Sequence, residues 1–357
     1  MIIPSLQVIA SPRMGGAETT FLRVVRALDT AGHPVTAGVR RGSDLSRLLD
    51  DTGRVVQLPM RNYIDVQTVL QIRQLLEVRK IPLVQTWASR ATWLTHAPGD
   101  TVHIARLGGY YKLRYFRHAD GWVVNTRGLR EWLVTKGFPP DRVEWINNFV
   151  APVVPGAAPA LNRERLGIPP EALVVIALGR MVEKKGFQDL IPAFARLPRE
   201  IQGRTVHLVL VGAGPMQPEL QAMGRDPSVL GRVHFTGWLD QPLAVLPMAD
   251  VFVCPSRIEP MGNVVLEAWS MGLPVICTET AGGSELVVSG DNGILTPVKD
   301  QARLAHAMES VLREDALRQG LAERGYALFH RHYSEQKTVE AFLDFYRRML
   351  RMKRTGA

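Results

Sequence analysis

Short apolar runs alternate with segments of helical spacing along most of the chain, and this pattern predicts repeated β-α units. In the first half, the strand candidates are 5–11, 33–39, 81–87, 121–126 and 143–147, and a helix is expected from about 18 to 30. Strands that alternate with helices favour a parallel sheet covered by helices on both faces.

A second β-α series follows the stretch APVVPGAAPALN at 151–162, whose prolines and small residues are typical of a linker. Its strand candidates are 173–179, 206–212, 233–237, 250–256 and 274–279. They are nearly continuous runs of Val, Ile and Leu, as expected for strands buried on both faces. We therefore expect two Rossmann-like α/β domains, 1–155 and 163–334, with a ligand held in a cleft between the carboxyl ends of their strands.

The last segment, 335–357, has apolar residues at helical spacing and ends in a strongly basic run. One prediction is an amphipathic helix that packs across the other domain. The alternative is a helix that lies on a membrane surface, as basic amphipathic helices can do.

Composition excludes several classes of protein. The chain has 357 residues, of which 46% are hydrophobic and 22% charged, as in globular proteins. No apolar stretch approaches the roughly 18 residues of a membrane-spanning helix. The N-terminus lacks the pattern of a secretory signal peptide. The only cysteines, Cys254 and Cys277, exclude a disulfide scaffold and a four-cysteine zinc site, suit the cytoplasm, and are expected to be buried structural thiols.

The net charge of +9 is unevenly distributed. Residues 1–155 carry 20 Lys and Arg against 12 Asp and Glu, whereas 156–334 carry 17 against 19. This asymmetry favours an anionic partner, and no zinc-finger or aromatic–basic RNA-binding pattern accompanies it. We expect an anionic lipid or glycolipid surface, or a basic face that is merely solvated, and no nucleic acid.

The stretch PSRIEPMGNVVLEAWSMG at 255–272 is the most informative part of the sequence. Glu259 and Glu267 cannot share one regular helix, because Pro260 and Gly262 lie between them. Glu259 is therefore expected in a loop, and Gly262 or Asn263 can cap a new helix that contains Glu267.

The first turn of that helix offers backbone N–H groups around Val264 and Val265 that can bind a phosphate. The two carboxylates would flank the phosphate and accept hydrogen bonds from sugar hydroxyls. The alternative makes Glu267 a partner of the helix dipole and Glu259 a solvated loop residue.

Two further loops follow predicted strands. In GRMVEKKGF at 179–187, Arg180 and Lys185 can hold a diphosphate and stabilise its negative charge as it leaves, although such loop cations are often only solvated. In PRMGGAE at 12–18, Gly15 and Gly16 permit close approach of a ligand to the backbone, although a plain glycine turn explains them equally well.

Together these motifs resemble the family 4 glycosyltransferases, which have the two-Rossmann GT-B architecture. The resemblance covers nearly the whole chain and is strongest from Leu178 to Leu295, where GRMVEKKG, LVLVGAGP, VHFTGW, the 255–272 stretch, GGSELV and NGIL follow in order. It implies retaining transfer of a sugar from a nucleotide diphosphate sugar, with no obligatory metal or other cofactor. It also implies that the last helix crosses back onto the N-terminal domain.

The family pattern assigns roles to residues at matching positions. It places Glu267 on the nucleotide ribose, Glu259 on donor-sugar hydroxyls, and Arg180 and Lys185 on the diphosphate, with Glu259, Arg180 and Lys185 as the catalytic set. The remaining donor-binding positions are Met261, Gly262, Asn263 and Val264 by their backbone, Gly15 and Gly16 in the glycine loop, and Gly237 and Trp238 near the base.

One position departs from the family pattern. Many members have a histidine in the N-terminal domain near the donor sugar, and Gly108 stands at that position here. His103 lies too early and is expected to be structural, so backbone groups or Arg106 would have to supply the polar contact. RLGGYY and NNFV resemble the forms in a subset of bacterial enzymes that build lipopolysaccharide or exopolysaccharide.

The segment RLGGYYKLRYFRH at 106–118 mixes cations with aromatic rings. We expect Arg106, Tyr110, Lys112 and Arg114 to bind an acidic saccharide or a polyprenyl-diphosphate acceptor. The alternative is a basic helix that packs by its aromatic side.

We expect a cytoplasmic glycosyltransferase. It either stays in the cytoplasm or binds peripherally to the inner face of the cytoplasmic membrane. It would use a UDP-sugar and a saccharide or lipid-linked acceptor in surface polysaccharide synthesis. The alternatives are a catalytically silent nucleotide-sugar-binding or scaffold subunit, and a hydrolysing or epimerising enzyme on the same fold.

Overall fold

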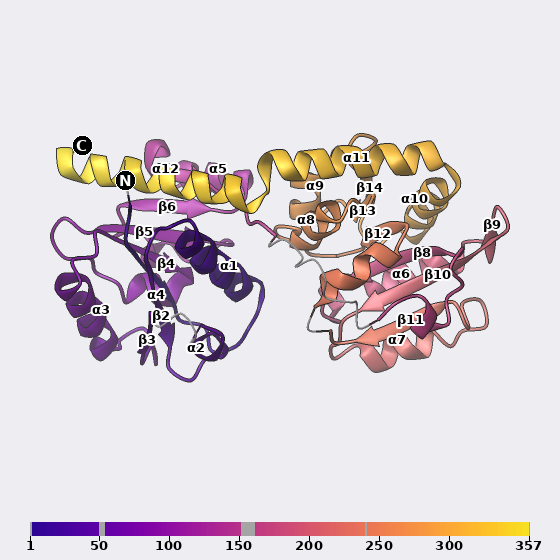
Figure 1. Cartoon of the computed structure of the whole chain (residues 1–357), viewed down its shortest axis with the longest axis horizontal. Helices are drawn as coiled ribbons and strands as arrows, with labels where there is room; N and C mark the ends of the chain where they lie inside the picture. The colour runs from indigo at the N-terminus through magenta and orange to yellow at the C-terminus, as the bar shows by residue number, and fades with distance from the viewer. Residues whose placement is uncertain (1, 50–53, 151–160, 240, 357) are drawn as a thin grey trace. The chain divides into compact units, whose positions relative to one another are not determined.

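The computed structural model describes residues 2–49, 54–150, 161–239 and 241–356. The chain divides into two compact units, Met1–Phe149 with Glu335–Ala357, and Val150–Ser334 (Figure 1). The expected linker falls largely on 151–160, outside the described residues. Each unit is a parallel α/β sandwich, as the alternation of strands and helices predicts.

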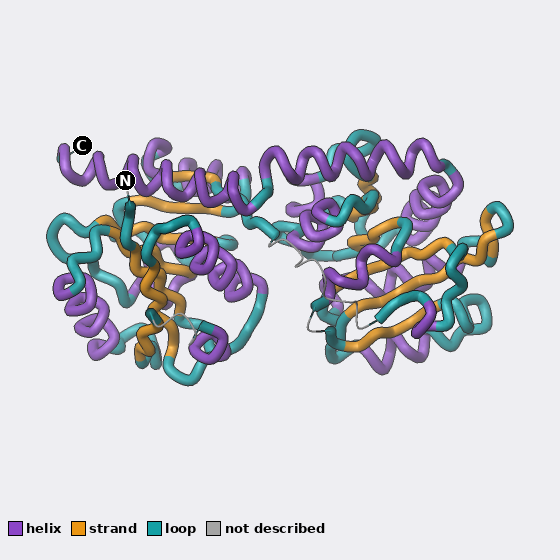
Figure 2. The backbone as a smooth tube through the Cα atoms, in the orientation of Figure 1, coloured by secondary structure: helices purple, strands orange, loops and turns teal. Residues whose placement is uncertain are grey.

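The sheet of the first unit has the strand order β3-β2-β1-β4-β5-β6-β7 and is parallel throughout. Helices lie on both of its faces (Figure 2). The strands are β1 (Ser5–Ile9), β2 (Val35–Arg40), β3 (Val55–Leu58), β4 (Leu83–Trp87), β5 (Val102–Leu107), β6 (Gly121–Val124) and β7 (Val143–Trp145). The helices are α1 (Gly16–Thr30), α2 (Asp44–Leu48), α3 (Val66–Val78), α4 (Ala88–Trp93), α5 (Arg127–Thr135) and the last helix, α12 (Glu335–Thr355).

The last helix belongs to the first unit, as expected of a helix that crosses back. Its apolar stripe, which includes Phe342, Phe345 and Tyr346, is buried in the same core as residues of α1 and β1. The helix lies beside α1 (Figure 1). The Tyr346 hydroxyl donates to Gln85 at 2.9 Å and accepts from Gln7 at 3.1 Å, so α12 is also hydrogen-bonded to β4 and β1. No helix in the described part of the chain is long and apolar enough to cross a bilayer.

The sheet of the second unit has the order β11-β10-β8-β12-β13-β14, with β9 antiparallel to β10. Its strands are β8 (Leu173–Leu178), β9 (Glu200–Ile201), β10 (Arg204–Val211), β11 (Val233–Gly237), β12 (Val251–Cys254), β13 (Val275–Thr278) and β14 (Ile294–Thr296). Its α-helices are α6 (Phe187–Ala195), α7 (Gln217–Met223), α8 (Asn263–Ser270), α9 (Ala281–Leu286), α10 (Gln301–Arg313) and α11 (Asp315–His332).

Short 3₁₀ turns complete both units: η2 (Leu113–Tyr115) and η3 (Pro140–Arg142) in the first, η4 (Glu164–Leu166), η5 (Glu183–Lys185) and η6 (Pro242–Met248) in the second. The central strands β8, β10, β12 and β13 are almost wholly buried, because helices cover both faces of the sheet, whereas the edge strand β11 is only half-buried. The two expected structural thiols lie side by side in this core, where Cys254 of β12 is in register with Cys277 of β13.

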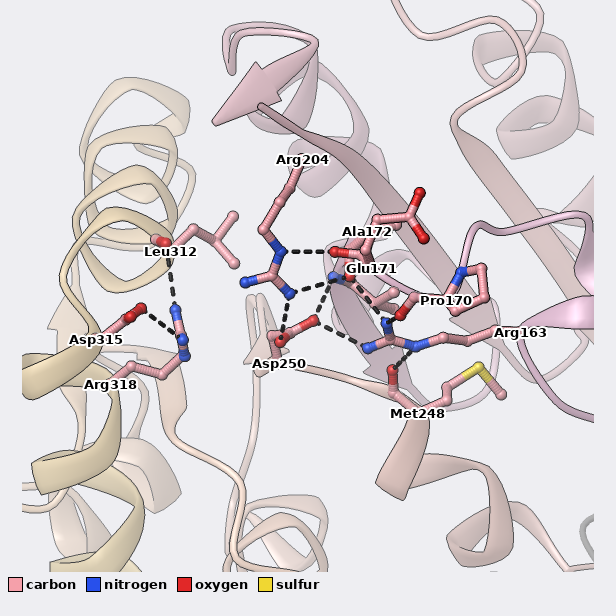
Figure 3. Close-up of polar contacts among 11 residues, drawn as sticks. Arg163, Pro170, Glu171, Ala172, Arg204, Met248, Asp250, Leu312, Asp315 and Arg318 are labelled. Carbon is pink, nitrogen blue, oxygen red and sulfur yellow. Dashed lines mark hydrogen bonds and ion pairs between the residues drawn. The ribbon is translucent and has the colours of Figure 1, made fainter. Parts of the chain in front are cut away.

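A polar cluster fixes β8 and β12 at the amino ends of the strands (Figure 3). Asp250 accepts a hydrogen bond from the Val174 N–H at 2.8 Å and one from Arg163 at 3.1 Å. Arg204 lies 3.6 Å from the same carboxylate. Arg163 also donates to the carbonyls of Met248 and two loop residues. The carboxyl ends of β8 and β12, at the opposite edge of the sheet, are thereby held side by side.

Candidate functional site

The loop after β12 and the helix α8 have the arrangement that the sequence predicts. Residues 255–262 form the loop, which contains Glu259, and α8 begins at Asn263. Gly262 precedes the helix with φ of 72°, a left-handed conformation that favours glycine. Glu267 therefore lies one turn into α8, as expected.

Backbone hydrogen bonds hold this loop against its neighbours. The N–H groups of Arg257 and Ile258 both donate to the Lys184 carbonyl, at 2.8 and 3.1 Å. The Glu259 carbonyl accepts from the Gly282 N–H at 2.7 Å. The loops after β8, β12 and β13 thus form one connected surface at the carboxyl edge of the sheet.

Gly186 lets the loops after β8 and β12 approach each other closely. A Cβ at this position would lie 1.9 Å from the Pro255 carbonyl oxygen, and φ is 71°. Any side chain would therefore be strained and would also push the two loops apart. This contact brings Lys185 next to Glu259.

Lys185 and Glu259 form an ion pair within the site. The Lys185 Nζ lies 2.5 Å from Glu259 Oε2, and the Ser256 hydroxyl donates to the same oxygen at 3.3 Å. The side chains are only 19% and 10% exposed. The alternative that Glu259 is a solvated loop residue is therefore wrong. Within the described residues, Glu259 Oε1 has no hydrogen-bond donor and can accept from a ligand hydroxyl.

The ion pair keeps Lys185 positively charged. Burial by itself lowers the pKa of Lys185, but the negative charges of Glu259 and Glu267 outweigh it and hold the pKa above its usual value. A fixed cation with two carboxylates nearby suits an anionic ligand that also carries hydroxyl groups.

Sequence reasoning missed the residue that anchors the Glu259 loop. Arg257 forms a two-pronged hydrogen bond with Asp189 of α6, at 2.7 and 2.8 Å, and contacts Glu183 at 3.1 Å. Hydrogen bonding to Asp189 raises the pKa of Arg257. Arg257 lies within the loop two residues before Glu259, but its partner is 68 residues away in the chain, so spacing does not reveal the contact.

Of the predicted phosphate contacts, the Arg180 side chain is available to a ligand and the Val265 N–H is not. Arg180 is exposed just beyond β8, and its side chain makes no ion pair within the described residues. Val265 is not available to a ligand as expected, because its N–H donates to the Gly262 carbonyl at 2.8 Å. No side chain caps α8 among the described residues, so Met261, Gly262, Asn263 and Val264 stay the predicted backbone contacts.

Gly237 ends β11 at the same edge of the sheet, and Trp238 follows it. The Gly237 carbonyl accepts from the Gly212 N–H at 3.0 Å, and φ at Gly237 is 70°. The Trp238 side chain is exposed and can offer a ring face to a planar base.

In the first unit, the predicted glycine loop precedes α1. Gly15 is extended with φ of −163°, and Gly16 is the first helical residue. The Met14 N–H donates to Asp44 at 2.9 Å, which ties the loop to the start of α2. Because Gly16 is already helical, α1 begins two residues before Glu18, where the sequence predicted its start.

Arg106 does not share a surface with the other predicted acceptor residues. It is 3% exposed, lies 4.7 Å from the Trp87 ring and 5.2 Å from the Phe342 ring, and donates to Asn148 at 2.6 Å. Burial lowers its pKa to about 10. The structure thus places this cation in the interior of the first unit.

From Gly108 on, the 106–118 segment is a loop with one 3₁₀ turn, so the alternative is wrong about a helix. It is right about the packing, because Phe116 is buried and Tyr111 and Tyr115 are half-buried against the same core. Lys112 and Arg114 are exposed, and Arg114 lies 4.8 Å from the Tyr115 ring. The exposed Tyr110 packs edge-on against Trp132 at 4.9 Å. These three residues share one loop and stay predicted acceptor contacts.

Gly108, which stands at the position of the family histidine, is exposed. It lies beside the buried side chain of Asn125, a residue that the sequence did not single out. A Cβ at Gly108 would lie 3.8 Å from the Asn125 amide nitrogen, and Asn125 Oδ1 has no hydrogen-bond partner within the described residues. His103 is buried and bonds to the Thr86 hydroxyl at 2.9 Å, in agreement with a structural role.

Metal-binding geometry is not found in the part of the chain that the structure describes. No group of three or more His, Cys, Asp or Glu side chains there could hold a metal ion.

Two parallel-sheet α/β units with a last helix returned to the first unit define the GT-B class of folds. HepE of Anabaena, solved in complex with UDP, superposes with a TM-score of 0.80 over 96% of this chain and 99% of its own, at 19% identity. The fold expected from the sequence is confirmed.

The chain belongs to the family 4 glycosyltransferases. A family model described as Glycosyltransferase Family 4 matches residues 14–154, and one described as Glycosyl transferases group 1 matches 172–314. The chain is 35% identical to the lipopolysaccharide core biosynthesis glycosyltransferase LpsE of Rhizobium meliloti, over 92% of this chain and 95% of LpsE. LpsD of the same organism is 29% identical over 94% of this chain and 95% of LpsD. The protein is therefore a glycosyltransferase.

Proposed function

We propose that this glycosyltransferase moves a sugar from a UDP-sugar to a saccharide or lipid-linked acceptor during synthesis of the bacterial lipopolysaccharide core, with retention of anomeric configuration and without a metal. The similarity to LpsE and LpsD supports the pathway, and the UDP and UDP-glucose complexes of HepE support the donor. The observation that carries the proposal is the cluster of Lys185, Glu259 and Glu267 beside the start of α8.

In the proposed donor complex, the diphosphate displaces Glu259 as the partner of Lys185. Lys185 and the exposed Arg180 hold the phosphate oxygens together with the first-turn backbone of α8. Glu259, released from the ion pair, accepts from donor-sugar hydroxyls, and Glu267 accepts from the ribose. Trp238 packs on the base, and Gly15 and Gly16 stay predicted donor contacts.

The proposed reaction breaks the bond between the sugar C1 and the β-phosphate oxygen. The acceptor hydroxyl forms the new bond to C1 on the same face, and its proton passes to the departing phosphate. Negative charge grows on the diphosphate as the bond breaks, so the fixed charges of Lys185 and Arg180 stabilise the transition state more than the ground state.

The proposed acceptor side is the first unit. Its loops carry Tyr110, Lys112 and Arg114, and residues 1–155 have the excess of basic residues that favours an acidic or phosphorylated acceptor. A lipid-linked acceptor would keep the protein at the inner face of the cytoplasmic membrane.

The experiment is a donor screen with detection of released UDP, using truncated lipopolysaccharide core as the acceptor. We expect UDP release that depends on the acceptor, and an NMR spectrum of the product with the anomeric configuration of the donor. Binding of UDP without turnover of any donor would favour the silent binding subunit. UDP release with free sugar or an epimer as the product would favour the hydrolysing or epimerising enzyme.

A further inference from the structure

The amino end of α3 presents an apolar corner to solvent. Ile64 is 82% exposed, and Val66 and Leu70, one turn apart on the same face of the helix, are 66% and 62% exposed. Single exposed aliphatic side chains are ordinary, but three within seven residues form a local patch of the kind that marks an interaction surface.

The loop that carries this patch is rigidly built. Asp65 accepts from the N–H groups of Arg61 and Thr68, at 2.9 and 3.2 Å, and the Thr68 hydroxyl accepts from the Met60 N–H at 2.9 Å. Met60 is buried with φ of 44°, a conformation that costs a non-glycine residue energy. Ile64 is therefore held in solvent by an ordered loop.

Aromatic rings and cations continue the patch on one side. The ring of Tyr63 stacks on Tyr115 at 4.8 Å, and Trp93 meets Tyr115 edge-on at 5.5 Å. Arg90 lies 5.7 Å from the Tyr63 ring, and Arg114 lies 4.8 Å from the Tyr115 ring. We name the apolar and aromatic residues of this surface the α3 corner: Tyr63, Ile64, Val66, Leu70, Trp93 and Tyr115.

The α3 corner lies at the carboxyl edge of its sheet. Its residues come from the segments that follow β3, β4 and β5, and parallel strands place those segments at one edge. Lys112 follows β5 in the same way. The predicted acceptor loop and the α3 corner are thus neighbours, and they meet at Tyr115.

We propose that the α3 corner docks the protein on a lipid bilayer with acidic headgroups. Ile64, Val66 and Leu70 would enter the boundary between headgroups and acyl chains, and the amphipathic rings would lie at headgroup level. The exposed Lys112 and Arg114 would bind lipid phosphates, whereas the half-buried Arg90 donates to the Met60 carbonyl at 3.3 Å. The nearby Asp65 is buried as the cap of α3 and does not oppose them.

Two other interpretations fit the observations less well. A saccharide stacks on an open aromatic face, but Tyr63 and Tyr115 stack on each other. The exposed side chains of Ile64, Val66 and Leu70 cannot form hydrogen bonds with sugar hydroxyls. The α12 helix is basic, but its apolar face is buried in the first unit and cannot enter a membrane. The proposal rests on the proposed function only in that a lipid-linked acceptor would then be presented beside its binding loop.

The test is co-sedimentation of the full chain with vesicles of phosphatidylcholine and phosphatidylglycerol in a two-to-one ratio, and with phosphatidylcholine alone. We expect binding to the anionic vesicles that weakens with salt. The Ile64→Ser/Leu70→Ser variant should lose most of this binding, and Arg114→Gln should weaken it about fivefold. Val78→Ser, at the 73% exposed far end of the same helix, is the matched control and should bind as the wild type does.

Each outcome has a defined meaning. Wild-type protein that stays in the supernatant with anionic vesicles would overturn the proposal, as would equal binding by Ile64→Ser/Leu70→Ser and Val78→Ser. Loss of binding in Arg351→Gln/Arg354→Gln alone would assign the contact to α12 instead. If the corner variant binds vesicles normally but has a raised KM for a detached saccharide, the surface binds saccharide and the proposal is wrong. Vesicle binding does not require turnover, so a failed transferase assay leaves this test intact.

Discussion

Replacing Lys185 by methionine removes the cation around which the proposed donor site is built. The side chain keeps its length, but Glu259, only 10% exposed, is left with the Ser256 hydroxyl as its polar partner. Loss of one partner from a largely buried ion pair should destabilise the second unit by about 2–4 kcal/mol. Loss of a fixed charge that faces the departing diphosphate should lower kcat about 100- to 1000-fold, or about 2.7–4 kcal/mol.

The two effects separate in a double-mutant cycle with Glu259→Gln. The double variant has no unpaired buried charge, so we expect about 1–3 kcal/mol of the lost stability to return in urea denaturation, whereas UDP release stays low. Lys184→Met is the matched control, because Lys184 is the exposed neighbour in the same turn, and it should retain wild-type stability and kcat. A folded Lys185→Met variant with kcat within tenfold of wild type would refute the reasoning.

Three further predictions follow from the same geometry. Gly186→Ala should lower the free energy of unfolding by well over the ~1–2 kcal/mol of left-handed strain, because its Cβ would also clash with Pro255. Gly167→Ala is the control, because Gly167 has φ of 68° and open space around it, and it should lose only the strain energy in thermal unfolding. Because the pKa of Lys185 is raised on folding, its stabilisation is complete below the unfolded value of about 10.4 and is lost as pH rises through the folded pKa. The stability gap between wild type and Lys185→Met should therefore be constant from neutral pH to about 10 and shrink above it, and a gap that grows there would contradict the pairing. Lys112→Ala/Arg114→Ala should raise the acceptor KM and leave UDP affinity unchanged in calorimetry, and an unchanged KM would remove this loop from the acceptor site.

Hydrophobic patterning was enough to predict the architecture, because buried parallel strands are continuous runs of Val, Ile and Leu. The same pattern does not predict strands that are short, half-buried or interrupted by polar residues. β3 is short and only half-buried, and β14 has three residues, so neither makes an apolar run. β5 is fully buried, but His103 and Arg106 interrupt its apolar run, so the strand around His103 is expected only from the family resemblance.

The candidate site was predictable where local chemistry defines it. Pro260 and Gly262 require a loop between the two glutamates and a helix start after it, whatever the rest of the chain does. The Lys185–Glu259 pair joins residues 74 apart, and the fork of Arg257 and Asp189 joins residues 68 apart. Such contacts depend on which strands become neighbours, so spacing along the chain does not reveal them.

Arg106 shows the limit of arguing from residue type. A cation in a basic and aromatic segment is usually exposed, but an inward-facing position on β5 places this one between Trp87 and Phe342. The contact with Phe342 depends on the return of α12 to the first unit. Local sequence around residue 106 carries no information about that helix.

The most direct test of the central claim is a crystal structure of the protein with UDP bound. We predict that the diphosphate lies at the start of α8, with Lys185 Nζ about 2.7–3.2 Å from a phosphate oxygen and Glu267 on the ribose. A structure in which Lys185 stays on Glu259 and UDP binds at another edge of the sheet would contradict the account.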